Sequence, residues 1–203
     1  MKRTRRQVVL VHGIWNTAGI FSSLSAYLER TGYQVHALSM QPNNGDAPLE
    51  QLAQQVAVFV EQKVPPTEPF DLVGFSMGGL VSRYYVQRLG GIKRVRRFVT
   101  VSAPHRGTVL GWFSRRYGVR QMRPGSAFIR SLNQDVDQLK TIQFYSLWTP
   151  FDLLILPPWS SRINVAWTQM IKVPSHNRMI RDASGLAAIA QALVDSDVPS
   201  ERL

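Results

Sequence analysis

Hydrophobic positions recur along the chain in two alternating patterns. Short apolar runs predict six strands, at residues 8–11, 34–38, 70–75, 95–102, 141–148 and 162–167. Apolar residues at helical spacing predict helices at 20–29, 49–64, 80–89 and 183–194. Strands that alternate with helices indicate a parallel sheet covered on both faces. We therefore expect an α/β fold with a mostly parallel sheet of about six strands.

The length and composition are those of one globular domain. The chain has 203 residues, of which 44% are hydrophobic, and we expect residues 1–203 to form a single domain. No apolar run approaches the roughly 20 residues of a membrane helix. A basic start at residues 2–6 precedes a short apolar run, which superficially resembles a signal peptide but is too short and lacks a cleavage site. We read it as the first strand, and expect a cytoplasmic protein without a transmembrane segment.

The chain is strongly basic. It has 24 Lys and Arg against 13 Asp and Glu, a formal net charge of +11, and much of the excess lies in residues 2–6, 93–97 and 115–130. Such a surface attracts phosphates, anionic lipid headgroups or nucleic acid, although solubility alone also explains it. Because no zinc, helix-turn-helix or RNA-binding motif accompanies the basic residues, we do not expect nucleic-acid binding. An anionic lipid surface stays open as a partner.

The chemistry is concentrated in a Gly-x-Ser-x-Gly motif between a predicted strand and a predicted helix. Gly74 and Gly78 flank Ser76, and a strand that turns directly into a helix leaves no room for side chains at those two positions. The Ser76 hydroxyl would project from the end of the sheet beside the amide of Met77, which opens the helix. Ser76 is therefore a candidate nucleophile.

With this motif the chain resembles a small lipase or esterase of the α/β-hydrolase family, over nearly its whole length. The resemblance implies a catalytic triad in the order serine, acid, histidine, each partner following a strand. His176 follows the last predicted strand, as the family's general base does. His105 is the competing histidine, but its place after the strand at 95–102 is one that shapes the pocket in this family.

The resemblance also implies an acid residue and an oxyanion loop. Asp152 follows the strand at 141–148 and is the expected acid, chosen over Asp71, Asp135, Asp137 and Asp182. The segment Val11-His12-Gly13-Ile14 resembles the oxyanion loop, so the backbone amides of Ile14 and Met77 are the expected donors, with a structural role for the His12 side chain.

The pocket is less determined by the sequence. We expect substrate contacts from Trp15, His105 and Trp159, and a lid or pocket wall within residues 107–130. The aromatic and arginine residues at 109–117 could either meet lipid surfaces or pack on the sheet. With four scattered histidines and no cysteine, no metal-ligand spacing is present, and we expect no metal and no cofactor.

The expected function is hydrolysis of carboxylic esters through an acyl-enzyme. Acyl transfer and thioester cleavage are alternatives, because the same triad serves all three and only the acceptor or leaving group differs. A basic hydrolase-fold protein that binds anionic lipid or a partner without catalysis is the contrasting hypothesis.

Overall fold

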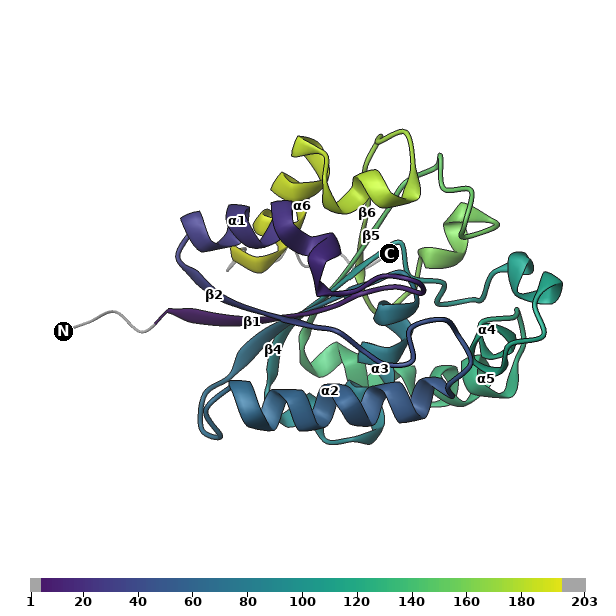
Figure 1. Cartoon of the computed structure of the whole chain (residues 1–203), viewed down its shortest axis with the longest axis horizontal. Coiled ribbons are helices and arrows are strands. Elements are labelled where there is room, and N and C mark those ends of the chain that lie inside the picture. Colours follow the sequence, from purple (N-terminus) through teal and green to yellow (C-terminus); the bar gives the residue numbers. More distant parts are fainter. Residues whose placement is uncertain (1–4, 195–203) are drawn as a thin grey trace.

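The computed structural model describes residues 5–194, in which six parallel strands form one sheet (Figure 1). The strands stand in the order β2-β1-β3-β4-β5-β6. Every pair of neighbouring strands runs parallel. Their bounds are β1 Arg6–Val11, β2 Tyr33–Leu38, β3 Phe70–Phe75, β4 Val95–Val101, β5 Gln143–Trp148 and β6 Trp167–Met170. The predicted fold class is confirmed.

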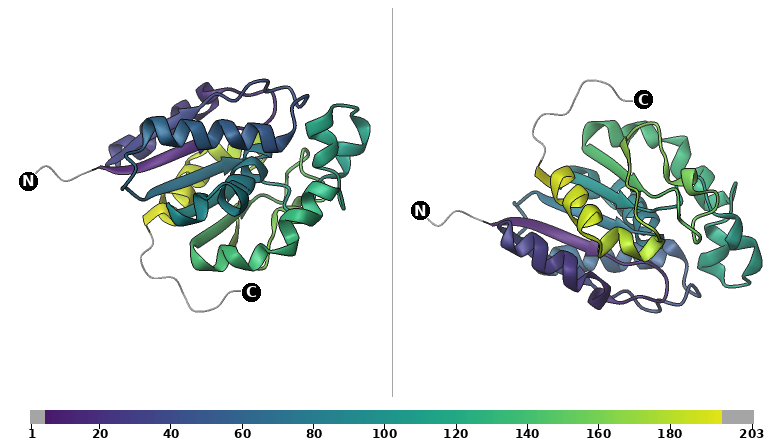
Figure 2. Two further views of the ribbon diagram at one scale, coloured as in Figure 1. Left: turned by 90° about the horizontal axis from the view of Figure 1, so that it is seen from below. Right: turned by 90° about the horizontal axis from the view of Figure 1, so that it is seen from above.

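Helices cover both faces of this sheet (Figure 2). One face carries α2 (Leu49–Lys63), α3 (Met77–Arg88) and α5 (Ala127–Gln134), and the other carries α1 (Ser22–Arg30) and α6 (Ala183–Val194). The short α4 (Tyr117–Gln121) lies near α5, beyond the carboxyl ends of the strands (Figure 1). Six 3-10 helices complete the described part: η1 Ala18–Phe21, η2 Gly91–Lys93, η3 Val109–Phe113, η4 Val136–Thr141, η5 Pro158–Ser161 and η6 His176–Ile180.

The core consists of two apolar layers, one on each side of the sheet. Within β1, Val8 and Leu10 belong to the layer under α1 and α6, whereas Val9 and Val11 belong to the layer under α2 and α3. Successive side chains of a strand point to opposite faces, so a strand buried on both faces is apolar at every position. This explains why the strands were visible in the sequence as continuous apolar runs.

Two boundaries differ from the predictions. The strand expected at 162–167 is wrong: residues 163–166 form a turn, closed by a 3.2 Å bond from the Ala166 amide to the Ile163 carbonyl, and β6 begins at Trp167. Ile163, Val165 and Ala166 are buried core residues, so their apolar character reflects burial and not a strand. In addition, the helix expected from residue 20 begins as the 3-10 turn η1, and α1 follows from Ser22.

None of the helices described within residues 5–194 is long and apolar enough to cross a membrane. The start of the predicted basic run, residues 2–4, lies outside the described residues.

Candidate active site

Ser76 lies at the sharp turn that joins β3 to α3. Its backbone angles are φ 56° and ψ −127°, a conformation that costs a non-glycine residue of the order of 1–3 kcal/mol. The turn is held on both sides, because the Ser76 amide donates to the Val101 carbonyl of β4 at 2.8 Å and its carbonyl accepts from Gly79 at 2.9 Å. The strain is therefore fixed by the sheet and by the first turn of α3.

Glycines allow the surrounding backbone to approach this turn. A Cβ on Gly78 would lie 2.3 Å from the Val11 carbonyl oxygen and 2.4 Å from that of His12. A Cβ on Gly74 would lie 2.6 Å from the Cα of Gly79. Since real Cβ atoms do not come so close to other backbone atoms, β1, β3 and α3 can meet here only without side chains.

Asp152 and His176 form a buried hydrogen-bonded pair. The His176 Nδ1 lies 2.7 Å from Asp152 Oδ2, and the two residues are 5% and 2% exposed. Asp152 follows β5, and His176 opens η6 after β6. The other Asp152 oxygen, Oδ1, accepts hydrogen bonds from the backbone amides of Leu154 and Ile155, both at 2.9 Å.

These contacts set the charge of Asp152. Burial raises the pKa of this carboxyl group, but the hydrogen bond and charge of His176, with the two backbone amides, outweigh burial and leave the pKa below its ordinary value. An ionised Asp152 accepts the proton on Nδ1 of His176. In a neutral ring, Nε2 then carries a lone pair and can accept a proton.

The ring of His176 lies beside the residue that precedes Ser76. It packs against Phe75 with 4.7 Å between ring centroids and an interplanar angle of 39°. Within the described residues no hydrogen bond joins His176 Nε2 to the Ser76 hydroxyl. The structure thus brings Asp152 and His176 into direct contact and sets the His176 ring beside Phe75, next to the turn that carries Ser76. Such nucleophile–base bonds are often long without substrate.

The loop after β1 lies directly against Ser76. A Cβ on Gly13 would be 2.9 Å from the Ser76 Cβ and 3.3 Å from its Oγ. The buried His12 ring accepts from the Met40 amide at Nε2, at 2.9 Å, and so donates from Nδ1 to the Gly13 carbonyl at 2.7 Å. Burial lowers the pKa of His12, which keeps this ring neutral. Its side chain is structural, as expected.

The two predicted oxyanion donors flank the same turn. Ile14 follows Gly13, and Met77 is the first residue of α3, whose amide has no partner within its helix. Among the bonds of residues 5–194, none occupies the amide of either residue. Their assignment as donors to an oxyanion remains a prediction.

Of the three side chains expected to contact substrate, two are exposed and one is not. Trp15 and Trp159 are 67% and 57% exposed, on the loops after β1 and in η5. His105 is 1% exposed, with Nε2 at 2.9 Å from Thr100 Oγ1 and its ring at right angles to Phe144. Burial, and then the charges of Arg83 and Arg106, lower its pKa well below the ordinary value. The loop thus turns the His105 ring toward the core, and substrate contact by this residue remains a prediction.

The alternative acids have other partners. Arg96 donates to both carboxylate oxygens of Asp71 at 3.0 and 2.8 Å, and Asp135 pairs with Arg88. Asp182 accepts from the Ser184 amide at the start of α6. Asp137 forms a surface pair with Lys140. Among the bonds within residues 5–194, none joins these four carboxylates to His176.

Sequence reasoning missed Thr149, which connects the two loops of the Asp152–His176 pair. Its buried hydroxyl donates to the Val173 carbonyl at 2.6 Å, between β6 and η6. The hydroxyl also accepts from the Phe151 amide at 3.3 Å. A threonine at the end of a predicted strand carries no distinctive signal, so only the structure assigns it this role.

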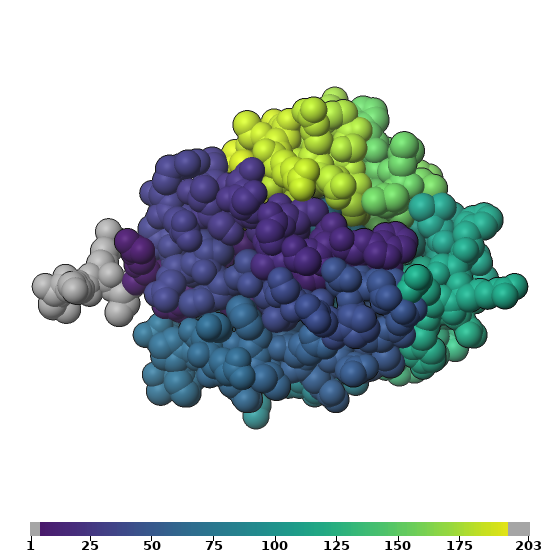
Figure 3. All heavy atoms as spheres, in the orientation of Figure 1, coloured from purple at the N-terminus to yellow at the C-terminus, as the bar shows by residue number. Residues whose placement is uncertain are grey.

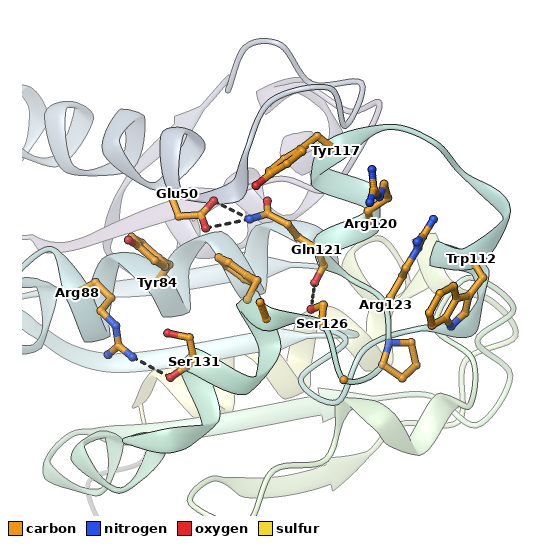
Figure 4. Close-up of a pocket in the computed structure, with 14 residues that line it drawn as sticks. Glu50, Tyr84, Arg88, Trp112, Tyr117, Arg120, Gln121, Arg123, Ser126 and Ser131 are labelled. Atoms are coloured by element: carbon orange, nitrogen blue, oxygen red, sulfur yellow. Dashed lines mark hydrogen bonds between the residues drawn. The ribbon is translucent and has the colours of Figure 1, made fainter.

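A cavity of about 520 Å³ lies elsewhere, between α2, α3, α4 and α5 (Figure 4). Its wall includes Trp112, Tyr117, Arg120 and Arg123, all from the predicted lid or wall segment. None of Ser76, Asp152 and His176 lines it, so it is separate from the site described here.

Comparisons with known proteins agree with this architecture. Lipase BlEst2 of Bacillus licheniformis, in its mature form, matches with a TM-score of 0.73 at 15% identity, over 93% of this chain and 91% of that chain. Aspergillus fumigatus lipase B matches with a TM-score of 0.77 at 17% identity, over 98% of this chain and 54% of that chain. At such identity these likenesses establish the α/β-hydrolase fold only.

The sequence itself gives a more specific relation. Palmitoyl-protein thioesterase 3 of Dictyostelium discoideum is 28% identical over 111 residues, which are 50% of this chain and 37% of that protein. The profile of the family described as palmitoyl protein thioesterase matches residues 7–150, a segment that contains Ser76 and ends before Asp152. The chain therefore belongs to the palmitoyl protein thioesterase family.

Proposed function

We propose that the protein is a serine hydrolase that cleaves acyl thioesters, and with them carboxylic esters, through Ser76, His176 and Asp152. The observation that carries the proposal is the buried 2.7 Å bond between His176 and Asp152, with the His176 ring packed beside the strained turn of Ser76. A structural role alone does not require a buried, hydrogen-bonded carboxylate and imidazole at that turn.

Each residue has its own role in forming the acyl-enzyme. His176 Nε2 takes the proton of the Ser76 hydroxyl as the oxygen bonds to the acyl carbon, and Asp152 stabilises the imidazolium that forms. The amides of Ile14 and Met77 hold the resulting oxyanion. The carbon–sulfur bond then breaks, and the leaving thiolate receives the proton from His176.

Water completes the reaction by the same residues. His176 removes a proton from the attacking water as a second tetrahedral intermediate forms. When the bond to Ser76 breaks, His176 returns that proton to the Ser76 oxygen and the carboxylic acid is released. A second acceptor in place of water would give acyl transfer, which remains an outcome of the test.

Membership of the palmitoyl protein thioesterase family supports a long acyl chain and a thioester as substrate. The carboxylic-ester activity expected from the sequence is then a second use of the same acyl-enzyme. We further propose one hydrolase domain, with residues 107–130 as a wall beside the site, and a cytoplasmic location.

The test measures release of thiol and of fatty acid from palmitoyl-CoA or an S-palmitoyl peptide, beside p-nitrophenyl esters of increasing chain length. We expect thiol and acid in equal amounts, and labelling of the wild type by a fluorophosphonate. The Ser76→Ala protein should show neither. Unlabelled wild-type protein without hydrolysis would refute the proposal, and thiol release without matching acid in the presence of an alcohol would indicate transfer.

A further inference from the structure

Exposed apolar side chains concentrate on one edge of the molecule. Among the described residues, twelve large hydrophobic side chains are exposed, and nine of them come from segments beyond the carboxyl ends of the strands. We call these nine the apolar edge. They are Trp15, Val109, Trp112, Phe113, Tyr117, Phe151, Leu153, Leu154 and Trp159. The other three are Val58, Met170 and Val194, and Met170 itself ends β6.

Backbone hydrogen bonds join the segments of the apolar edge. The Val109 amide donates to the Leu156 carbonyl at 2.9 Å, which ties η3 to the loop that follows Asp152. The Arg106 amide donates to the Ser160 carbonyl in η5 at 3.0 Å. In Figures 1 and 3 the teal segment around η3 and α4 forms the right-hand end of the molecule, and the green segment that follows β5 lies above and to its left.

The exposure of these side chains has no folding benefit. Phe113 is 87% exposed and Leu153 is 76% exposed, so both leave almost all of their apolar surface in water. Trp15 is held at φ 57°, a strained backbone angle for a tryptophan, by a 2.6 Å bond from its amide to the Asn43 carbonyl. Large exposed apolar side chains gathered at one edge of a molecule are typical of an interaction site.

Positive charge surrounds the apolar edge. Residues 103–134 contain six arginines and no acidic residue. Of these, Arg106, Arg115, Arg116, Arg120 and Arg130 are exposed, and Arg116 pairs with Asp46 at 2.7 Å. Arg123 stacks on Trp112 with its Cζ 4.6 Å from the ring centre (Figure 4). A second copy of the chain would bring the same positive charge to this edge, and the two edges would repel.

We infer that the apolar edge docks on the surface of an anionic lipid bilayer, with its aromatic and leucine side chains among the headgroups and the arginines against the lipid phosphates. Tryptophan and arginine are the side chains that suit this boundary. The lipid surface would be the partner of the proposed acyl hydrolase. Docking rests on the proposed function only in that the function supplies a reason for it. Docking would place Ser76 close to acyl chains that do not leave the membrane.

The test uses full-length Ser76→Ala protein, so that binding is measured without turnover. Co-sedimentation is carried out with vesicles of phosphatidylcholine alone and with vesicles that also contain phosphatidylglycerol. We expect binding to the mixed vesicles, much weaker binding to phosphatidylcholine, and loss of binding as salt rises.

Two pairs of variants separate the apolar from the electrostatic contribution. Phe113→Asp should lower the partition coefficient about tenfold or more, whereas Val58→Asp, an exposed valine of α2, should not change it. The double variant Arg115→Gln with Arg120→Gln should lose most of the preference for anionic vesicles. Its matched control changes Lys63 and Lys93 to Gln, exposed lysines at the opposite ends of the strands.

Thermal melts verify that the variants fold, and Phe113→Ala replaces Phe113→Asp if the latter melts early. Equal binding of the Phe113 variant and the Val58 control would overturn the inference, as would equal binding to both kinds of vesicle. Dimers in sedimentation velocity that Phe113→Asp dissociates would overturn it in favour of a second copy. If the protein binds vesicles but the wild type hydrolyses nothing, the proposed function fails and the docking inference stands.

Discussion

The substitution Asp152→Asn tests the proposed triad with little change in shape. In the wild type, Asp152 Oδ1 accepts from the amides of Leu154 and Ile155, and Oδ2 accepts from His176 Nδ1. An asparagine must keep its carbonyl oxygen toward the two backbone amides, because its NH₂ group cannot accept from them. The NH₂ group therefore faces Nδ1 of His176 and donates to it, so that the imidazole proton moves to Nε2, the atom required to act as a base.

The expected magnitude follows from this reversed tautomer. Loss of the base and of the charge that stabilises the imidazolium should lower kcat by about 10³- to 10⁴-fold. That corresponds to about 4–5.5 kcal/mol of transition-state stabilisation, at about 1.36 kcal/mol per tenfold change. Because Asp152 is 2% exposed, loss of its charge-assisted bond should also lower the free energy of unfolding by about 1–3 kcal/mol, a fall in Tm of about 2–4 °C per kcal/mol.

The assay is hydrolysis of palmitoyl-CoA and of a p-nitrophenyl ester, with kcat and KM determined separately and Tm measured on the same samples. Asp182→Asn is the matched control, since Asp182 accepts a backbone bond from Ser184 that an asparagine oxygen can also accept. Its activity should equal that of the wild type. An Asp152→Asn protein that folds normally and retains kcat within tenfold of the wild type would refute the triad.

Three further predictions concern stability and loop position. In the wild type, the buried neutral His105 takes up a proton only on unfolding, so the free energy of unfolding falls by about 1.4 kcal/mol per pH unit below about pH 6.5. His105→Gln should make this fall less steep, which urea melts from pH 4.5 to 7.5 measure. An unchanged slope would contradict the prediction. Gly78→Ala should lower the free energy of unfolding by about 2 kcal/mol or more, because the new Cβ would meet two carbonyl oxygens. In the control Gly19→Ala the new Cβ would lie 3.6 Å from the nearest atom, so the free energy of unfolding should change by less than about 0.5 kcal/mol. Thr149→Val removes the hydroxyl that donates to the Val173 carbonyl, and should lower kcat between about tenfold and 100-fold with little change in KM; a wild-type kcat would show that this bond does not position the pair.

The fold could be predicted because the central strands β1, β3, β4 and β5 are buried on both faces. The apolar residues of 8–11 and 70–75 alternate between the two core layers, and such strands appear in a sequence as short, mostly apolar runs bounded by glycine, proline or polar residues. The same rule failed at residues 162–167. There Ile163 and Val165 belong to a turn whose side chains are buried in the core. In a sequence, the apolar residues of a buried turn look the same as those of a buried strand.

The site could be predicted only as far as its motifs are local. Ser76 and its glycines stand within five positions, and a bend of that kind requires those residue types. The contact of Asp152 with His176 spans 24 positions and was predicted from the family's chain order alone. His105 shows the limit of such reasoning: it also follows a strand, and only the structure shows that its ring is buried against Thr100 and Phe144.

The geometry of the triad suits an ester and a thioester equally, so the preference for one substrate must be set by other groups. The bond from His176 to Asp152 and the amides near Ser76 act on the carbonyl group, which both substrates share. Discrimination must come from groups that contact the acyl chain or the leaving group, and we propose that exposed side chains of residues 107–117 and 151–159 supply them. If those segments lie on a bilayer, the membrane itself supplies part of the acyl-binding surface. The acyl chain length that the enzyme prefers should then be longer for esters presented in detergent-free vesicles than for the same esters free in water. An identical preference in both media would place the whole acyl pocket within the protein.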